Sequence, residues 1–183
     1  MSTLKPPLNA RDHVRGNPEA PIQLVEYGDY ECPFCGRAHL VVKAIEQALG
    51  DDLLYAFRHF PLTQVHPHAM RAAQAAEAAA LQDGFWKMHD MLFTHQDALD
   101  EPHLFSYAEL CGLDMEQFAR DIDSDEVAER VRSDFLSGAR SGVNGTPTFF
   151  VNGMRYEGSW EPNTFLAVLR QLLVEESEAL GPP

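Results

Sequence analysis

Residues 26–35 read Glu-Tyr-Gly-Asp-Tyr-Glu-Cys-Pro-Phe-Cys, and this stretch decides the fold. It joins an apolar segment, residues 22–27, which is typical of a buried strand, to a helix-like segment, residues 37–49. Cys32 and Cys35 therefore form a Cys-x-x-Cys pair at the predicted start of a helix. Free backbone N–H groups and the helix dipole stabilise a thiolate at that end, so the pKa of such a cysteine falls below about 8.5. The position predicts a redox-active pair.

The geometry of a helix start assigns a different role to each cysteine. Cys32 is expected to expose its sulfur and to act as the attacking nucleophile. Cys35 lies about one turn further along, so its sulfur points back under the helix and serves as the resolving thiol. Pro33 suits the first helical turn, where its missing N–H group costs nothing.

Two other interpretations of the pair remain open from the residues alone. Cysteine is often a small buried apolar residue, and the two thiols can simply be packed in a core. Alternatively the pair is half of a zinc site, but structural zinc usually takes four ligands and the sequence has no second cysteine pair. The third cysteine, Cys111, lies at the C-terminal end of a predicted helix, which does not favour a thiolate, and we expect it to be buried.

The composition is typical of one soluble globular domain, with 183 residues, 45% hydrophobic and 23% charged. The formal net charge of -14 argues against nucleic acid or an anionic membrane surface as a partner. The first residues have no apolar core of a signal peptide, and no apolar run approaches transmembrane length, so we expect a cytoplasmic protein. In a reducing compartment, a close cysteine pair is catalytic more often than structural. The sequence leaves the oligomeric state open.

The remaining chain shows alternating strand and helix patterns. Residues 53–60 predict a second strand, stopped by Pro61, so the strand, helix and strand form a parallel unit. Residues 66–142 are almost continuously helical, and Pro67 suits a first helical turn. The helices expected there lie at 69–81, 85–93 and 102–111, followed by two that open at the N-caps Asp114 and Asp123.

The pattern changes at Gly142, where a turn leads into a strand. Asn152-Gly153 predicts a two-residue hairpin whose second strand is 154–156, and a final helix starts near Pro162. Residues 1 to about 20 are polar and contain several prolines, so we expect an ordered or semi-ordered lead-in that carries no chemistry.

This order of elements resembles the thioredoxin fold with an inserted helical domain, as in the DsbA-like oxidoreductases. Three segments carry the resemblance: residues 25–35, residues 66–93 and residues 142–149, which include Gly145-Thr146-Pro147. The resemblance implies an α/β fold in a single domain, residues 1–183. Its thioredoxin-like part is expected at about 20–62 and 143–176, and its helical insertion at about 66–142.

The resemblance also implies roles for individual residues. Pro147 is expected to follow a cis peptide bond and to face Cys32, while Thr146 offers backbone hydrogen bonds to an extended substrate. Glu26 is expected beneath the cysteine helix as a proton relay, although its position in a strand equally suits a surface-facing or paired carboxylate. Phe34 occupies the variable position between the cysteines that tunes the redox potential.

Two departures from the family pattern concern the thiolate. Strongly oxidising periplasmic members have a histidine where this chain has Phe34, and Phe34 cannot stabilise a thiolate. Glu31 is expected to oppose the ionisation of Cys32 by like charge. Both residues predict a weaker oxidant, and the chain is more similar to cytosolic DsbA-like proteins.

The sequence therefore predicts a thiol–disulfide oxidoreductase that acts on protein or small-molecule thiols, with glutathione or a thioredoxin system as candidate redox partner. We expect that no metal, nucleotide or flavin is needed, and the sequence has no Gly-x-Gly-x-x-Gly or Walker motif. Two alternatives remain. One is a redox-sensing binding module without turnover, and the other is a glutathione-dependent transferase or isomerase on the same fold, which would not need Cys35.

Overall fold

The computed structural model describes residues 2–179, and residues 180–183, the end of the acidic tail, lie outside the described part. Its centre is a five-stranded sheet of order β1-β3-β2-β4-β5. The strands are β1 (His13–Gly16), β2 (Ile22–Gly28), β3 (Leu53–His59), β4 (Thr148–Val151) and β5 (Met154–Arg155). β2 pairs parallel with β3, which confirms the predicted parallel unit, and antiparallel with β4.

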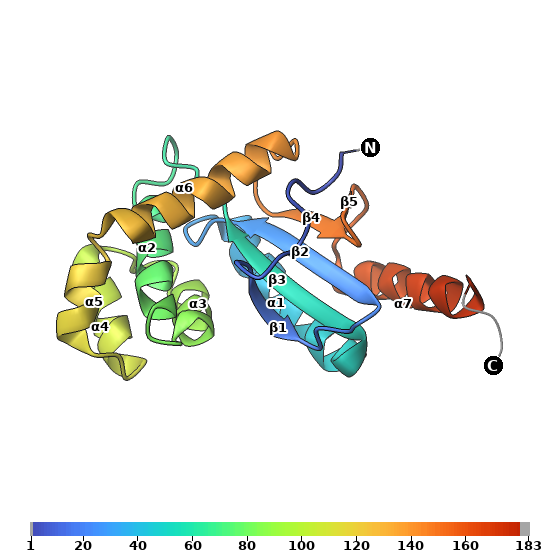
Figure 1. The fold of residues 1–183 in the computed structure, drawn as a ribbon, viewed down its shortest axis with the longest axis horizontal. Helices are drawn as coiled ribbons and strands as arrows, with labels where there is room; N and C mark the ends of the chain where they lie inside the picture. The colour runs from blue at the N-terminus through green and yellow to red at the C-terminus, as the bar shows by residue number, and fades with distance from the viewer. Residues whose placement is uncertain (1, 180–183) are drawn as a thin grey trace.

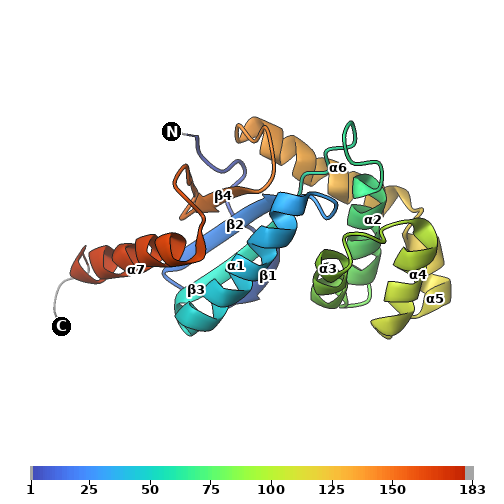
Figure 2. The same cartoon turned by 180° about the vertical axis from the view of Figure 1, so that it is seen from behind.

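The two faces of the sheet are covered by different elements. Helix α1 (Pro33–Leu49) and helix α7 (Pro162–Ala179) lie along one face, as Figures 1 and 2 show from opposite sides. Apolar side chains of β2 and β3 that point to this face, among them Leu24 and Phe57, join the larger core. The other face packs a smaller cluster that includes Tyr27, Phe60 and Phe150. A short 3-10 turn (Gly50–Asp52) connects α1 to β3.

A helical insertion lies between β3 and β4 and occupies the space beyond one end of the sheet (Figure 1). Its helices are α2 (Ala69–Ala80), α3 (Phe85–Thr94), α4 (Glu101–Leu110), α5 (Met115–Asp121) and α6 (Asp125–Arg140). Helix α6 returns from the insertion to the sheet and leads into β4. The fold class is therefore confirmed as a thioredoxin-like α/β fold with an all-helical insertion.

The N-terminal segment is more structured than the sequence predicts. Residues His13–Gly16 form β1, which pairs antiparallel with the outer side of β3. Near the chain start, Thr3 bridges to Met154 of β5, so the segment crosses the sheet from one edge to the other. The lead-in is therefore ordered, but the sequence does not predict its strand, because the hydrogen-bonding edge of β3, rather than an apolar pattern in residues 13–16, creates β1.

Most element boundaries lie within about one residue of the sequence prediction, and two helix starts differ in the residue that caps or opens the helix. Asp114 is the N-cap of α5, as predicted, and accepts a hydrogen bond from the backbone of Gln117. The predicted N-cap Asp123 was wrong by one residue, because the Ser124 hydroxyl caps α6 instead. Pro67 precedes the first turn of α2 rather than lying within it, since that helix begins at Ala69.

The predicted hairpin is confirmed at residues 152 and 153. Asn152 and Gly153 have φ angles of 48° and 78°, and both positive values suit the tight turn that joins β4 to β5. Within residues 2–179, no helix is both long enough and apolar enough to span a bilayer.

Candidate active site

Cys32 is the N-cap residue of α1, and Pro33 occupies the first turn as predicted. Both cysteines of the pair are free thiols. The pKa of Cys32 is lowered to about 5, first by a hydrogen bond from Cys35, against the opposing effect of burial, and further by Thr146 and by the helix-start N–H groups of Phe34 and Cys35. The expectation of an openly exposed sulfur was wrong, because Cys32 is only 4% exposed. The residue is thus poised as a thiolate inside a covered site.

Cys35 is fully buried, and its environment acts on its thiol in the opposite direction. Burial raises the pKa of Cys35 well above its ordinary value, and its hydrogen bond to Cys32 and the charge of Glu26 raise it further. The backbone N–H of Asp29 lies 3.5 Å from Sγ of Cys35. One hydrogen bond therefore favours the ionised form of Cys32 and the protonated form of Cys35, which suits the predicted roles of nucleophile and resolving thiol.

Glu26 lies beneath the pair, in the middle of β2, and is 1% exposed. Its Oε2 accepts a hydrogen bond of 2.7 Å from the Tyr55 hydroxyl. Its Oε1 is buried and has no hydrogen-bond partner among the residues that the structure describes. Burial raises the pKa of Glu26 to about 7, and the charge of Cys32 adds to this effect. A carboxyl group with such a pKa can both hold and release a proton near neutrality.

The loop before β4 covers Cys32 from the other side. The Thr146–Pro147 peptide bond is cis, as predicted. The thiol of Cys32 donates to the carbonyl oxygen of Thr146 over 3.5 Å. The Thr146 hydroxyl is buried and unpartnered within residues 2–179, so it can donate to the sulfur once Cys32 ionises. This arrangement places Thr146 directly against the nucleophile.

Phe34 and Glu31, the two residues expected to weaken the thiolate, have different surroundings. Phe34 is 53% exposed, and the Arg37 guanidinium lies 4.7 Å from the centre of its ring. The carboxylate of Glu31 accepts hydrogen bonds from the backbone N–H and the imidazole of His68, at 2.7 and 2.9 Å. Glu31 is therefore engaged with His68, and the pKa of Cys32 remains low beside it.

The turn that carries Cys32 is supported by three polar side chains to which the sequence analysis assigns no role, those of Asp29, His66 and Gln96. The carboxylate of Asp29 accepts from the backbone of Glu31 and Leu62 and contacts Nδ1 of His66 at 2.8 Å. The Gln96 side chain, from the turn after α3, donates to the carbonyl oxygens of Tyr30 and Cys32 at 2.8 and 2.9 Å. A polar residue in a loop carries no periodic signal, and so only the folded geometry identifies these contacts.

Gln96 also explains the glycine that follows Cys35. A Cβ atom built on Gly36 would lie 1.9 Å from Oε1 of Gln96, which is an impossible contact. A larger residue at position 36 would displace the Gln96 side chain from its place over the first turn of α1. The helical insertion is in this way attached to the turn that carries the nucleophile.

Within residues 2–179, the groups of side chains that could hold a metal ion do not include the cysteine pair. Two groups of buried or half-buried side chains in the described chain have ligand atoms close enough for a cation: His39 with His89 and Asp90, and His59 with Glu77 and Asp134. Neither group includes Cys32 or Cys35, so the pair offers only two thiolates where structural zinc usually takes four ligands. This geometry disfavours the zinc interpretation. Cys111 is buried, as predicted.

Comparison with known proteins finds a matching family and similar regions in longer proteins. Residues 8–171 match the family described as Thioredoxin. The chain is 47% identical, over 171 residues, to a region of "Na(+)/H(+) antiporter NhaA 1" of Mycolicibacterium gilvum, covering 92% of the chain and 28% of that protein. It is also 47% identical to part of "Na(+)/H(+) antiporter NhaA" of Herminiimonas arsenicoxydans, covering 91% and 26%. The chain spans about a quarter of the length of these relatives.

Solved structures resemble the chain over nearly its whole length. A thioredoxin-like oxidoreductase from Silicibacter pomeroyi is 28% identical, with a TM-score of 0.79, and the match covers 93% of this chain and 94% of that one. The α-DsbA1 protein of Wolbachia pipientis is 26% identical, with a TM-score of 0.82 and coverage of 95% and 96%. Oxidised BdbD from Bacillus subtilis, at 24% identity and a TM-score of 0.82, covers 94% and 97% and shares the fold.

Proposed function

Because the chain belongs to the thioredoxin family and is a DsbA-like thiol–disulfide oxidoreductase, we propose that it exchanges disulfides with protein substrates through Cys32 and Cys35. The observation that carries the proposal is the opposed protonation of the two thiols. The pKa of Cys32 is lowered to about 5, while burial raises the pKa of Cys35 well above its ordinary value. At neutral pH, Cys32 is the attacking thiolate and Cys35 keeps its proton.

In the oxidising direction, a substrate thiolate attacks Sγ of Cys32 in the Cys32–Cys35 disulfide. A bond forms between the substrate sulfur and Cys32, the bond between the two cysteines breaks, and Cys35 leaves as a thiolate that takes up a proton. A second substrate thiolate attacks the mixed disulfide, releases an oxidised substrate and leaves Cys32 as a thiolate. Glu26 supports this sequence, because its carboxyl, with a pKa of about 7, can supply the proton that Cys35 needs.

The lowered pKa of Cys32 supports a reduction potential between that of thioredoxin, a reductant, and that of DsbA, an oxidant. Stabilising the Cys32 thiolate stabilises the reduced form and makes the disulfide a stronger oxidant. A pKa of about 5 lies between the values of about 7 in thioredoxin and about 3.5 in DsbA. We therefore expect a reduction potential between about -270 and -120 mV.

The test is to equilibrate the pair against glutathione, and then to measure turnover with a disulfide-bonded protein substrate. Wild type should form a reversible disulfide and turn over, Cys32→Ser should do neither, and Cys111→Ser should match wild type. A Cys35→Ser variant that kept full activity would indicate a transferase that uses one thiol. A reversible disulfide without turnover would indicate a redox sensor, and the absence of any disulfide would refute the proposal.

The relatives named as antiporters suggest a class of partner. Regions nearly half identical to this chain occur in proteins named "Na(+)/H(+) antiporter NhaA", which favours a membrane transporter as the disulfide substrate. Cys35→Ser removes the resolving thiol and should retain such a partner on Cys32 as a mixed disulfide. Identifying the trapped proteins tests this point, and a set without any membrane transporter would contradict it.

A further inference from the structure

A cavity of about 520 Å³ lies between α6 and the loop of residues 6–12. It is on the face of the sheet opposite Glu26, because Arg58, at its floor, follows Phe57 in β3 and alternate residues point to opposite faces. No lining residue belongs to the cysteine pair or to the Thr146–Pro147 loop. A volume of this size suits a small organic ligand.

The guanidinium of Arg58 forms the floor of the cavity, and each of its N–H groups already donates a hydrogen bond within the protein. Arg58 donates to both carboxylate oxygens of Asp12 at 2.7 and 2.9 Å. Its other N–H groups reach the carbonyl oxygens of Pro6 and Pro7 and the Tyr27 hydroxyl. Arg58 and Asp12 therefore neutralise each other and hold the loop in place.

The second acidic side chain in the lining is also fully engaged. Asp134 forms an ion pair with Arg130 of the same helix and accepts a hydrogen bond from the backbone N–H of His59. Arg130 additionally donates to the carbonyl oxygen of Arg11 at 3.0 Å, which links α6 to the loop. Both aspartates of the lining are thus already paired with arginines.

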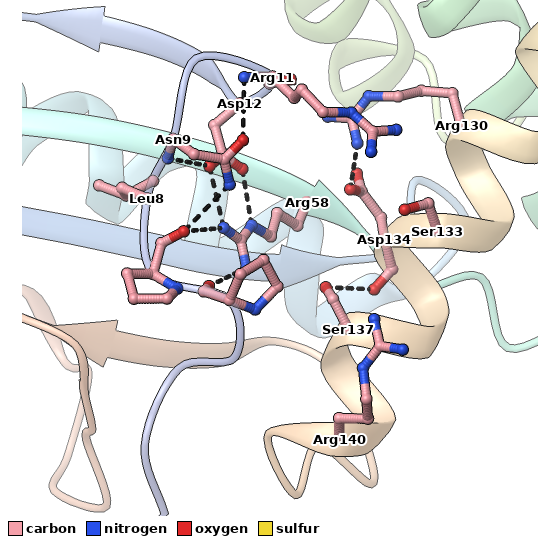
Figure 3. A pocket seen from close by; sticks show the side chains of 12 residues that line it. Leu8, Asn9, Arg11, Asp12, Arg58, Arg130, Ser133, Asp134, Ser137 and Arg140 are labelled. Atoms are coloured by element: carbon pink, nitrogen blue, oxygen red, sulfur yellow. Dashed lines mark hydrogen bonds and ion pairs between the residues drawn. The ribbon is translucent and has the colours of Figure 1, made fainter.

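Two guanidinium groups of the lining are left over, those of Arg11 and Arg140 (Figure 3). Arg11 comes from the loop and Arg140 from the last turn of α6, and neither side chain forms a hydrogen bond or ion pair with any residue in 2–179. The Ser133 hydroxyl lies on the α6 wall between them. The lining holds four arginines against two aspartates, a formal charge of +2. The whole chain carries -14, so this cavity departs from the general charge of the molecule.

We propose that this cavity binds a small organic or inorganic anion with at least two carboxylate or phosphate groups. Arg11 pairs with one group and Arg140 with another, since a guanidinium fork matches the geometry of both kinds of oxyanion. Ser133 donates a further hydrogen bond, and Arg58 fixes the floor without contributing a free donor. The ligand therefore bridges the N-terminal loop and α6.

The experiment is isothermal titration calorimetry on the reduced full chain in low-salt Tris chloride. Pyrophosphate and tricarballylate, a tricarboxylate, are the two probes, and whichever binds more tightly identifies the preferred oxyanion. We expect a Kd below about 1 mM for at least one probe and weaker binding as salt is added. Arg11→Ala/Arg140→Ala should raise that Kd by about tenfold or more. Arg58 is left intact because its loss would release the loop.

The matched control removes the same charge elsewhere. Arg120 and Arg132 are exposed, lie outside the cavity and form no ion pair or hydrogen bond with residues 2–179. Arg120→Ala/Arg132→Ala should change the Kd by less than about twofold. Equal weakening in both double variants would show that only the net charge matters and would overturn the site, as would the absence of binding by either probe. Cys32→Ser should bind like wild type, which separates this cavity from the redox site.

Discussion

At the scale of single residues, the redox site depends on one hydrogen bond between two thiols. Cys35 donates to Cys32, and this contact lowers the pKa of one cysteine while it raises the pKa of the other. The difference between the thiols is therefore a shared property of the pair, and neither the helix start nor burial alone accounts for it.

Replacing Cys35 with Ala should raise the pKa of Cys32 from about 5 toward the ordinary thiol value of about 8.5, because the thiolate loses its closest donor. The pH dependence of alkylation of Cys32 measures this change, with Cys111→Ala in both proteins to remove the remaining thiol. An unchanged midpoint near pH 5 would mean that the helix start and Thr146 alone stabilise the thiolate.

The raised pKa of Glu26 predicts that the reduced protein loses stability as the pH rises. Burial raises its pKa to about 7 in the folded chain, whereas an unfolded glutamate titrates near 4.3. Its contribution is complete below about pH 4.3 and is lost as the pH rises to about 7, because only the unfolded chain releases the proton easily in that range.

Glu26→Gln should remove this loss and keep the acceptor for Tyr55. At about pH 8 it should therefore be more stable than wild type by about 3 kcal/mol, and the advantage should disappear near pH 4. Urea unfolding of both proteins across this pH range gives the comparison. A constant difference at all pH values would show that Glu26 is ionised, or hydrated, in the folded chain.

At the scale of elements, the helical insertion is attached to the cysteine turn by Gln96, which donates to the carbonyl oxygens of Tyr30 and Cys32. Gln96→Ala should lower the free energy of unfolding by about 1–2 kcal/mol, because two carbonyls lose their donor. It should also slow disulfide exchange, since the turn that positions Cys32 loses a fixed contact.

The matched variant is Gln82→Ala. Gln82 makes two similar hydrogen bonds, to the backbone of Asp114, but lies within the insertion and away from the cysteines. It should lose comparable stability without a change in the exchange rate. If both variants slowed exchange equally, the effect of Gln96 would be one of stability alone.

The elements differ in how far the sequence predicts them. The parallel unit around the Cys-x-x-Cys pair, the five helices of the insertion and the Asn152-Gly153 hairpin carry local signals, and all are confirmed. β1 carries no such signal, because residues 13–16 contain one apolar side chain and form a strand only beside β3. Its pairing is a tertiary effect.

The residues of the active site also differ in how far the sequence predicts them. The cysteines and the Thr-Pro pair stand in recognisable motifs, whereas Gln96 and Tyr55 act through contacts between distant segments. The aromatic ring of Tyr55 predicts only that it is buried in a strand. Its hydroxyl becomes significant once the register places it against Glu26, and no local pattern in the sequence encodes that contact.

At the scale of the whole molecule, a buried glutamate joins the two halves of the fold. Glu77 of α2 contacts His13 of β1 at 2.8 Å and His59 of β3 at 2.7 Å. Burial acts to raise the pKa of Glu77, but the hydrogen bonds and charges of the two histidines overcome it and hold the pKa far below its ordinary value.

Glu77→Gln should therefore destabilise the protein by about 3 kcal/mol near neutral pH, because the buried imidazole of His59 and the half-buried imidazole of His13 lose their charged partner. The pH dependence of this contribution to stability is opposite in direction to that of Glu26. The contribution of a glutamate with a lowered pKa is present above about pH 4.3 and is lost as the pH falls, so the two proteins should converge in acid. Urea unfolding at several pH values checks this, and a difference that grew in acid would contradict the assignment.

The path of the N-terminal segment has a consequence for colloidal behaviour. β1 covers the outer side of β3, and Ser2, Thr3 and Leu4 bond to the β5 hairpin at the opposite edge. Removing residues 2–12 should uncover that second edge and invite strands of neighbouring molecules to add to it. Light scattering of concentrated samples should then rise with time for the truncated chain and stay flat for the intact one. A flat trace for both would mean that β5, at two residues, is too short to seed a growing fibril.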